Sequence, residues 1–323
     1  MTGAALAATV VVPVRDLDVR ELVAALRAQS IGVDRFEVVL ADDGSTSPLG
    51  VAPEKGWLRI DTASHRNSYA ARNRGAQLAR GEVIAFCDAD CVPAPDWLER
   101  GLAAFDTGAA LVAGEVWPRR PQRLNPWALL DADDSFNQER AVREGYALGG
   151  NLLVLRDLFD RLDGFDETRP SGGDFDFARR AARAGAPPVF ARDARVTHPT
   201  LDDGRAFLRR AWFRDRYHAS RDSARRGGVL ETLPKLVPVA GAIWARKRLG
   251  RPLLLDRARI DWGDALPPRR TVVVALTVRY LVLPYVAAAA RVAAALAAVR
   301  RGGGRRRTAA AAGAGSRRAA REG

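Results

Sequence analysis

Apolar runs alternate with helix-like segments along the front part of the chain. The runs, which are typical of buried strands, lie at residues 8–14, 36–41, 58–63, 83–87 and 109–116. Segments with helical character separate them, at residues 21–29, 68–80 and 95–105. Ser68 is the predicted N-cap of the second of these helices. This alternation predicts an α/β fold, with a Rossmann-like, mainly parallel sheet and helices on both faces.

The pattern becomes less regular further along. Residues 117–126 are rich in Pro and Arg and are expected to form a loop. A helix is expected over residues 174–184, and short strand-like pieces follow at 188–191 and 195–198. We therefore predict that the first domain comprises residues 1–200.

The C-terminal part of the chain has a different composition. Residues 201–270 read as a basic helical extension, and residues 271–299 form an apolar stretch whose only charges are Arg279 and Arg291. This stretch is long enough to cross a bilayer, with both arginines extending toward the interface. Its helix is expected to lie on the membrane or to span it once, and a soluble core helix is the alternative. Residues 300–323, made mostly of Arg, Gly and Ala, are expected to be disordered.

Charge is divided between these parts. Residues 1–200 carry a net charge of −5 and residues 201–323 one of +18, which together give the +13 of the whole chain. A basic rear favours an anionic partner, and an apolar helix beside an Arg cluster favours the anionic cytoplasmic face of a membrane. No fold signature for specific nucleic-acid binding is present. The two cysteines, Cys87 and Cys91, are too few for a zinc site or a disulfide framework, and residues 1–8 do not resemble a cleavable signal.

Pairs of aspartates occur at three points of the chain, each directly after an apolar run or a Gly-rich turn. Asp88 and Asp90 come directly after the apolar run 83–87, where a buried parallel strand would end and where open α/β sheets bind their ligands. Alternate residues of an extended segment point the same way, so the two carboxylates can converge on one divalent cation, whose shell phosphate oxygens would complete. An isolated Asp-x-Asp is also a common loop start or helix cap.

The other two clusters strengthen the cation interpretation. Asp42 and Asp43 follow the run 36–41, and Asp174 and Asp176 follow a Gly-rich turn. A nucleoside site, a metal-diphosphate site and a proton acceptor are together what a nucleotide-sugar transferase requires.

With these motifs in this order, residues 8–200 resemble the family 2 glycosyltransferases of the GT-A fold. The matching segments are Val-Val-Val-Pro-Val (10–14), Asp-Asp-Gly-Ser (42–45), Ala-Ala-Arg-Asn-Arg-Gly (70–75), Gly-Glu-Val-Ile-Ala-Phe-Cys-Asp-Ala-Asp (81–90), Gly-Gly-Asn (149–151), Gly-Phe-Asp-Glu (164–167) and Gly-Asp-Phe-Asp (173–176). The resemblance implies an inverting enzyme that moves a sugar from a nucleotide diphosphate sugar to an acceptor hydroxyl.

The resemblance also implies which residues bind the donor. They lie at the ends of the first, second and fourth strands and on the helix between them: Pro13, Val14, Asp42, Asp43, Arg72, Asn73, Asp88 and Ala89. Asp90 would hold the Mn²⁺ or Mg²⁺ that bridges the diphosphate, where the cation acts as a Lewis acid. His198 matches a position at which some relatives supply a further metal ligand, although a single His after a strand is more often structural.

Asp174 matches the catalytic base, which would take the proton of the attacking acceptor hydroxyl. The family commonly has Glu before this Asp, whereas this chain has Gly173. The acceptor or sugar side is expected to contain Gly149, Gly150, Asn151, Gly173 and Asp176. Instead of contacting the acceptor, Asp176 could form an ion pair with Arg179 or Arg180.

Three other functions compete with this assignment. A haloacid-dehalogenase-like phosphatase also uses Asp-x-Asp, but after its first strand and with a Lys downstream, and here no Lys follows until Lys235. A sugar nucleotidyltransferase would need a Gly-rich loop after the first strand, and this chain lacks such a loop there. A non-catalytic membrane-binding scaffold would leave the acidic clusters unexplained. The Gln-x-x-Arg-Trp signature of processive synthases is absent, so we expect the enzyme to transfer a single sugar. The acceptor is unknown and could be linked to a lipid.

Overall fold

The computed structural model describes residues 6–64, 67–121, 123–134, 136–222, 269–283, 285–287, 289–290 and 293. These residues fall into two compact units. One contains the described residues up to 120 and from 134 to 200, and the other those from 121 to 133, from 201 to 222 and from 269 onward. Most of the predicted basic extension and the whole predicted tail lie outside the described residues.

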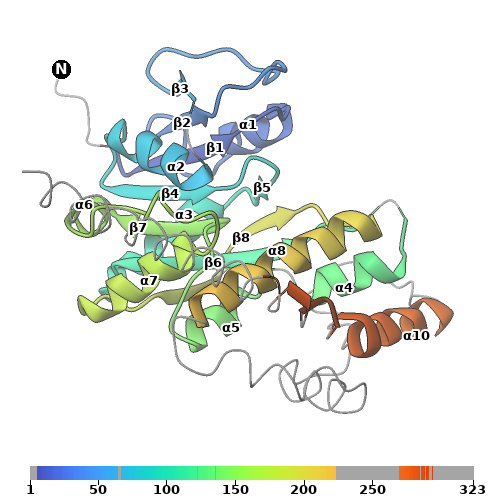
Figure 1. Ribbon diagram of the computed structural model, residues 1–323. Helices are drawn as coiled ribbons and strands as arrows, with labels where there is room; N and C mark the ends of the chain where they lie inside the picture. Colours follow the sequence, from blue (N-terminus) through green and yellow to red (C-terminus); the bar gives the residue numbers. More distant parts are fainter. Residues whose placement is uncertain are drawn as a thin grey trace, which may run out of the picture. The chain divides into compact units, whose positions relative to one another are not determined.

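A single eight-stranded sheet organises the first unit (Figure 1). Its strands are β1 (Ala8–Val14), β2 (Phe36–Asp42), β3 (Leu58–Thr62), β4 (Val83–Cys87), β5 (Val92–Pro93), β6 (Leu111–Pro118), β7 (Asn151–Leu155) and β8 (Val189–His198). Their order is β3-β2-β1-β4-β7-β6-β8-β5. The strands β3, β2, β1 and β4 are parallel, as the alternating pattern predicts.

Beyond β4 the sheet departs from the mainly parallel arrangement. The strand β7 runs antiparallel to both β4 and β6, β6 and β8 are parallel, and the short β5 is antiparallel to β8. The α/β class is therefore confirmed, but the sheet is mixed. An apolar run indicates a buried strand without fixing its direction, so this part of the topology could not be read from the pattern.

The helices of the first unit are α1 (Arg20–Arg27), α2 (Ser68–Gln77), α3 (Trp97–Ala103), the 3₁₀ helix η1 (Ala104–Thr107), α5 (Gln138–Arg143), α6 (Arg156–Arg161) and α7 (Gly173–Arg183). The helices predicted at 21–29, 68–80, 95–105 and 174–184 are present with shifted ends. The short helices α5 and α6 were not predicted, because one or two turns carry too little periodicity.

Both faces of the sheet are covered, as predicted. Alternate residues of β1 enter two different cores: Val10 and Val12 join the core that includes Leu22 of α1 and Trp97 of α3, whereas Val11 joins the other. That second core is built from β-strand residues, α2 and an aromatic group contributed by α6, α7 and the segment between them. The parallel centre of the sheet is therefore buried on both sides, which explains its continuous apolar runs.

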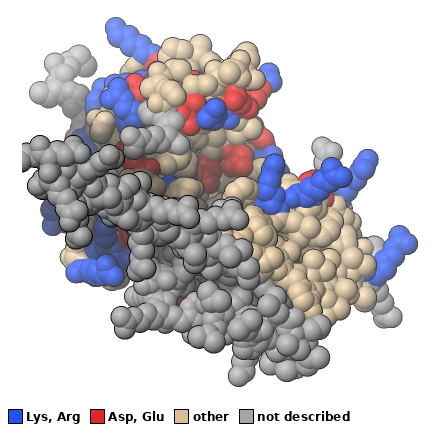
Figure 2. Space-filling view, in the orientation of Figure 1, with Lys and Arg blue, Asp and Glu red and all other residues tan. Residues whose placement is uncertain are grey.

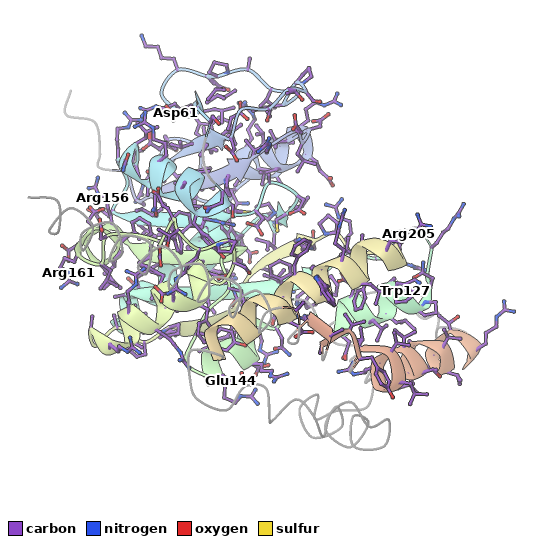
Figure 3. All side chains as sticks on the ribbon, viewed as in Figure 1. Asp61, Trp127, Glu144, Arg156, Arg161 and Arg205 are labelled. Atoms are coloured by element: carbon purple, nitrogen blue, oxygen red, sulfur yellow. The ribbon has the colours of Figure 1, made fainter. Side chains whose placement is uncertain are left out.

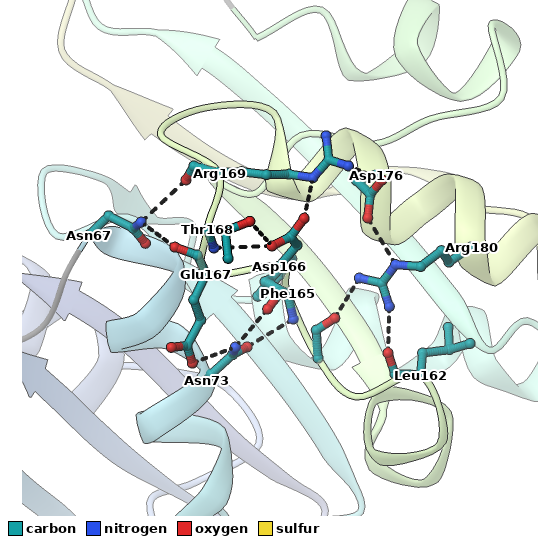
Figure 4. Close-up of polar contacts among 11 residues, drawn as sticks. Asn67, Asn73, Leu162, Phe165, Asp166, Glu167, Thr168, Arg169, Asp176 and Arg180 are labelled. Atoms are coloured by element: carbon teal, nitrogen blue, oxygen red, sulfur yellow. Dashed lines mark hydrogen bonds and ion pairs between the residues drawn. The ribbon is translucent and has the colours of Figure 1, made fainter. Parts of the chain in front are cut away.

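The helix α2 lies close to the sheet and is tied to a distant loop. A Cβ atom on Gly75 would lie 2.4 Å from Cγ1 of Val11, so glycine permits this close approach. The N-cap is Asn67 rather than the predicted Ser68: the Asn67 side chain accepts from the N–H groups of residues 69 and 70. Its amide nitrogen donates to the carbonyl oxygens of Glu167 and Arg169, at 2.8 and 3.2 Å (Figure 4).

The described part of the second unit is helical. It contains α4 (Pro126–Asp134), α8 (Gly204–Asp222), α10 (Arg269–Thr277) and the π-helical turn η3 (Val278–Val282). Figure 3 labels Trp127 on α4 and Arg205 on α8; the Trp127 ring packs 5.8 Å from that of Phe207. Arg210 of α8 pairs with the buried Asp131 of α4.

Arg279, which was expected from the sequence to extend toward a membrane interface, is engaged within the second unit. Its side chain is buried and pairs with Asp133, because a buried guanidinium requires a counter-charge. Among the helices of the described residues, none combines the length and the apolar character that a membrane span requires.

The capping assignment leads to a stability prediction. Asn67→Ala should lower the free energy of unfolding by about 1–2 kcal/mol, the typical cost of losing an N-cap, because two N–H groups of α2 lose their acceptor. Ser68→Ala is the matched control, since it removes a neighbouring polar side chain that does not cap the helix, and it should change stability by less than about 0.5 kcal/mol. Chemical denaturation measures both, and a larger loss for Ser68→Ala would contradict the assignment.

Candidate active site

The carboxyl ends of the parallel strands bring two of the acidic clusters to one edge of the sheet. Val14 at the end of β1 pairs with Asp42 at the end of β2, and on the other side of β1 the strand β4 ends just before Asp88. Asp42 is buried, and its Oδ1 accepts from the N–H and hydroxyl of Ser45, at 3.0 and 2.5 Å. Asp43 lies 3.6 Å from the guanidinium of Arg15 and donates its N–H to Val14.

Pro13, Val14 and Ala89 also lie at this edge, at the end of β1 and just after β4. Figure 2 shows Asp and Glu side chains, in red, on the part of the surface formed by the first unit. The nucleoside-facing positions predicted from the sequence are therefore neighbours in the fold, with β1 between the two acidic clusters.

Arg72 connects this edge to the start of β7. Its guanidinium is buried and donates from Nη2 to Oδ1 of Asp88, while Nε has no hydrogen-bond partner among the described residues. A Cβ atom on Gly149 would lie 3.7 Å from Cζ of Arg72 and 3.4 Å from Cβ of Asp174. The buried guanidinium of Arg72 on α2 therefore lies near both the carboxylate of Asp88, which follows β4, and the carboxylate of Asp174, at the start of α7.

The two glycines before β7 allow this close packing. The N–H of Asp88 lies 3.4 Å from the carbonyl oxygen of Gly150. A Cβ atom on Gly150 would lie 2.9 Å from Oδ2 of Asp88 and 2.9 Å from the ring of Phe136. A side chain here would displace the Asp88 carboxylate, which gives a physical reason for glycine at this position.

Asp174 lies in the first turn of α7 and accepts three hydrogen bonds. Its Oδ2 accepts from the N–H of Gly149 at 2.8 Å, and its Oδ1 accepts from the N–H of Phe175 at 2.9 Å and from the hydroxyl of Tyr69 at 3.3 Å. Burial, and after it the charge of Asp174, raise the pKa of Tyr69, so this hydroxyl remains a donor. Tyr69 was not predicted, although its position three residues before Arg72 places both on one face of α2.

Asp90 and His198 form the next part of the site. Nε2 of His198 lies 3.3 Å from Oδ2 of Asp90, and Nδ1 lies 2.7 Å from the carbonyl oxygen of Pro199. Burial opposes the charge on both groups, but their mutual hydrogen bond prevails: the pKa of Asp90 is lowered and that of His198 is raised. The ring of Phe136 packs 4.5 Å from the imidazole.

A carbonyl oxygen only accepts, so Nδ1 of His198 carries a hydrogen and Nε2 is the nitrogen that faces Asp90. This arrangement is common for metal-binding histidines, whose other ring nitrogen donates to a carbonyl or carboxylate. Within the described residues, no group of three or more His, Cys, Asp or Glu side chains is arranged to hold a metal by itself.

Asn151 was predicted to face the acceptor, but the structure places it in the interior. It is fully buried, and its side chain bonds the carbonyl oxygens of Glu115 and Ala194 and the indole N–H of Trp97, each at 2.9 Å. These three bonds join β6, β7, β8 and α3. Because a buried amide needs its hydrogen-bonding capacity satisfied, Asn151 holds the sheet together rather than facing a ligand.

Asn73 and Asp176 are also engaged within the protein (Figure 4). The Asn73 amide exchanges two hydrogen bonds with the backbone of Phe165, at 2.8 and 2.9 Å, and donates to Oε1 of Glu167 at 3.0 Å. Asp176 pairs with Arg180, which is one of the two alternatives expected from the sequence, and with Arg169. Contact of Asn73 with a nucleotide and of Asp176 with an acceptor therefore stay predictions.

Comparison with known proteins agrees with this arrangement. Residues 9–162 match the family model described as "Glycosyl transferase family 2". Glycosyltransferase AglE of Haloferax volcanii is 30% identical over 209 residues, which cover 61% of this chain and 68% of that protein. The pre-mycofactocin glycosyltransferase of Mycobacterium tuberculosis is 31% identical over 221 residues, covering 64% of this chain and 45% of that protein.

The fold also has a counterpart among solved structures. The mannosyltransferase PcManGT from Pyrobaculum calidifontis, in complex with GDP-Man and Mn²⁺, superposes with a TM-score of 0.52 at 20% identity, covering 90% of this chain and 75% of that one. At this identity the likeness shows a shared GT-A-like fold. Taken with the family match and the similarity to AglE, it leads to one conclusion: the chain belongs to the family 2 glycosyltransferases.

Proposed function

We propose that the protein transfers one sugar from a nucleotide diphosphate sugar to an acceptor hydroxyl, with inversion and with the help of a divalent cation. The observation that carries this proposal is the linkage of Asp88 and Asp174, through Arg72 and Gly149, at the edge where the parallel strands end. A donor-side carboxylate and a hydrogen-bonded base are thereby held in one place. Membership of the family argues against the phosphatase interpretation of the Asp-x-Asp sequence.

The donor would bind along the carboxyl edge of β1, β2 and β4. Asp42 and Asp43 lie where a nucleoside base and ribose would offer N–H and O–H donors. The guanidinium of Arg72, which lies beside Asp88, supplies positive charge at this edge, and positive charge favours an anionic ligand. Among the relatives, PcManGT was solved with a GDP-sugar, which supports this class of donor.

The Asp90 and His198 pair fits a divalent cation. An oxygen of Asp90 and Nε2 of His198 face one another, and the hydrogen bond of Nδ1 to Pro199 leaves Nε2 with its lone pair when the ring is neutral. With only two protein ligands, the remaining positions suit diphosphate oxygens and water, as is usual for Mg²⁺ and similar cations bound with phosphates. When bound, such a cation would neutralise charge on the leaving nucleoside diphosphate.

Asp174 is the residue we propose as the base. A carboxylate has about four lone-pair sites. Within the part of the chain that the structure describes, Oδ1 accepts two hydrogen bonds and Oδ2 accepts one, from Gly149. Oδ2 would therefore take the acceptor proton while the acceptor oxygen bonds to the anomeric carbon. The bond from that carbon to the diphosphate oxygen breaks, its electron pair leaves with the nucleoside diphosphate, and this single displacement inverts the anomeric centre.

The metal role can be tested by binding alone. Asp90→Ala should abolish the gain in GDP or UDP affinity that Mn²⁺ produces, as measured by titration calorimetry with and without the metal. Asp96→Ala removes a nearby carboxylate that pairs with Arg100 on the surface, and this control should retain the wild-type response. An unchanged Mn²⁺ effect in Asp90→Ala would remove Asp90 as a ligand.

The base can be tested by separating binding from turnover. Asp174→Asn keeps the shape of the side chain but loses the proton acceptor, so donor affinity should remain while turnover falls by about 10²–10⁴-fold. A panel of nucleotide sugars, ranked first by thermal shift, supplies the donor for the assay. Near-normal turnover would exclude Asp174 as the base, and failure of the wild-type protein to bind any donor would favour a non-catalytic scaffold.

We further propose that the enzyme acts at the cytoplasmic face of a membrane, on an acceptor held there. The second unit exposes most of the large apolar side chains that are exposed in the described residues: Phe213, Val273, Val274, Leu281, Val282 and Tyr285. Arg205, Arg209 and Arg270 are exposed on the same unit. Basic residues near an anionic surface contribute about 1 kcal/mol each, and partly buried apolar side chains add to the binding.

Vesicle sedimentation tests this placement. The full chain should bind vesicles that contain phosphatidylglycerol, release them at high salt and bind pure phosphatidylcholine weakly. The double substitution of Val273 and Val274 by Ser should weaken binding at least about fivefold because apolar area is lost. Val33→Ser, at an exposed position of the first unit, is the matched control; equal binding of both variants, or no preference for anionic vesicles, would refute the proposal.

A further inference from the structure

The residue before Asp174 lies directly against an aromatic ring. A Cβ atom on Gly173 would lie 2.9 Å from Cδ1 and Cε1 of Tyr69 and 3.0 Å from Cδ2. The Tyr69 ring therefore fills the space into which a side chain at residue 173 would extend. The resemblance described above would place Glu here, and this chain has no side chain at all.

The hydroxyl of the same tyrosine is directed to the carboxylate of the next residue. It donates to Oδ1 of Asp174 over 3.3 Å, beside the bond from the N–H of Phe175. We propose that Tyr69 positions the Asp174 carboxylate through this hydroxyl, and that glycine at residue 173 is what gives the ring its place. This inference rests on the proposed role of Asp174 as the base, and Tyr69 is a positioning residue rather than a catalytic one.

Other contacts hold the backbone around Tyr69 and Asp174 in place. The N-cap Asn67, two residues before Tyr69, donates to the carbonyl oxygens of Glu167 and Arg169 in the loop that leads to α7 (Figure 4). Arg169 in turn pairs with Asp176 in the first turn of that helix, at 2.9 Å. The start of α2 and the start of α7 are therefore joined by contacts other than the Tyr69 hydroxyl, so removing that hydroxyl should leave the backbone in place.

Tyr69 can perform this role because it keeps its proton. Burial and the negative charge of Asp174 raise its pKa, so the hydroxyl donates at any working pH of the enzyme. Among the described residues, the ionisable groups near Asp174 include Arg72 on α2, Tyr146 on the segment before β7 and Asp176 on its own helix. The pKa of Tyr146 is raised by burial and by Glu144, with the charge of Asp174 as a smaller cause.

A single-atom deletion tests the role. Tyr69→Phe keeps the ring and removes the hydroxyl, so the affinity for donor should stay unchanged while kcat falls about tenfold, the order expected for a net hydrogen bond to a charged group. A fall in kcat with an unchanged KM for the donor would separate positioning of the base from a general loss of structure, which would affect both.

Tyr146→Phe is the matched control, because it also removes one hydroxyl from the neighbourhood of Asp174. Its ring packs 4.8 Å from that of Phe175, and Glu144 has a larger influence on its hydroxyl than Asp174 has. It should leave kcat unchanged. Equal losses of kcat in the two variants would show a general effect of polarity and would overturn the proposal.

Gly173→Ala provides a second, independent arm. The added methyl group would displace the ring and lengthen the bond from Tyr69 to Asp174, so kcat should fall in the wild-type background. In the Tyr69→Phe background the same substitution should cost much less, because the bond is already lost; this non-additivity measures the coupling. Additive losses would indicate that residue 173 acts independently of Tyr69.

The outcomes separate this inference from the proposed function. If Asp174→Asn is inactive while Tyr69→Phe matches the wild type in kcat, the positioning role of Tyr69 is wrong and the base assignment stands. If Asp174→Asn retains turnover, the base assignment itself fails. Thermal melting of each variant confirms that the comparison is made between folded proteins.

Discussion

The buried pairing of Arg72 with Asp88 is the interaction on which the site depends. A guanidinium removed from water is stable only when its charge is matched, and the carboxylate that matches it stands at the end of β4. The same guanidinium lies beside Gly149, whose N–H holds Asp174. Three parts of the chain that are distant in sequence, namely α2, the end of β4 and the start of β7, are thereby fixed relative to one another around one charge.

Much of this arrangement could be predicted from the sequence, for identifiable reasons. Strands buried on both faces read as continuous apolar runs, so β1, β2 and β4 were evident, and parallel strands bring the carboxylates that follow them to one edge. The direction of β7 was not readable. The roles of Asn73 and Asn151 were not readable either, because an amide in a motif looks the same whether it binds a ligand or satisfies the backbone.

The corrections have a common physical origin in tertiary contacts. Asn67 rather than Ser68 caps α2, and its amide nitrogen also contacts the loop before α7. Arg279 lies buried beside Asp133, which local composition does not reveal. Tyr69 was missed because a tyrosine early in a helix carries no motif, and only the folded chain shows its ring in the place of a side chain at residue 173.

We propose that Asp88, Asp90 and Asp174 serve one nucleotide-binding site at the carboxyl edge of the sheet. Crystallographic analysis of the full chain with GDP or UDP and Mn²⁺, using anomalous scattering to locate the metal, addresses it most directly. We expect a manganese peak bound by Asp90 and His198, with the nucleotide lying across the ends of β1, β2 and β4. A metal peak away from Asp90, or a nucleotide bound on another surface, would contradict it.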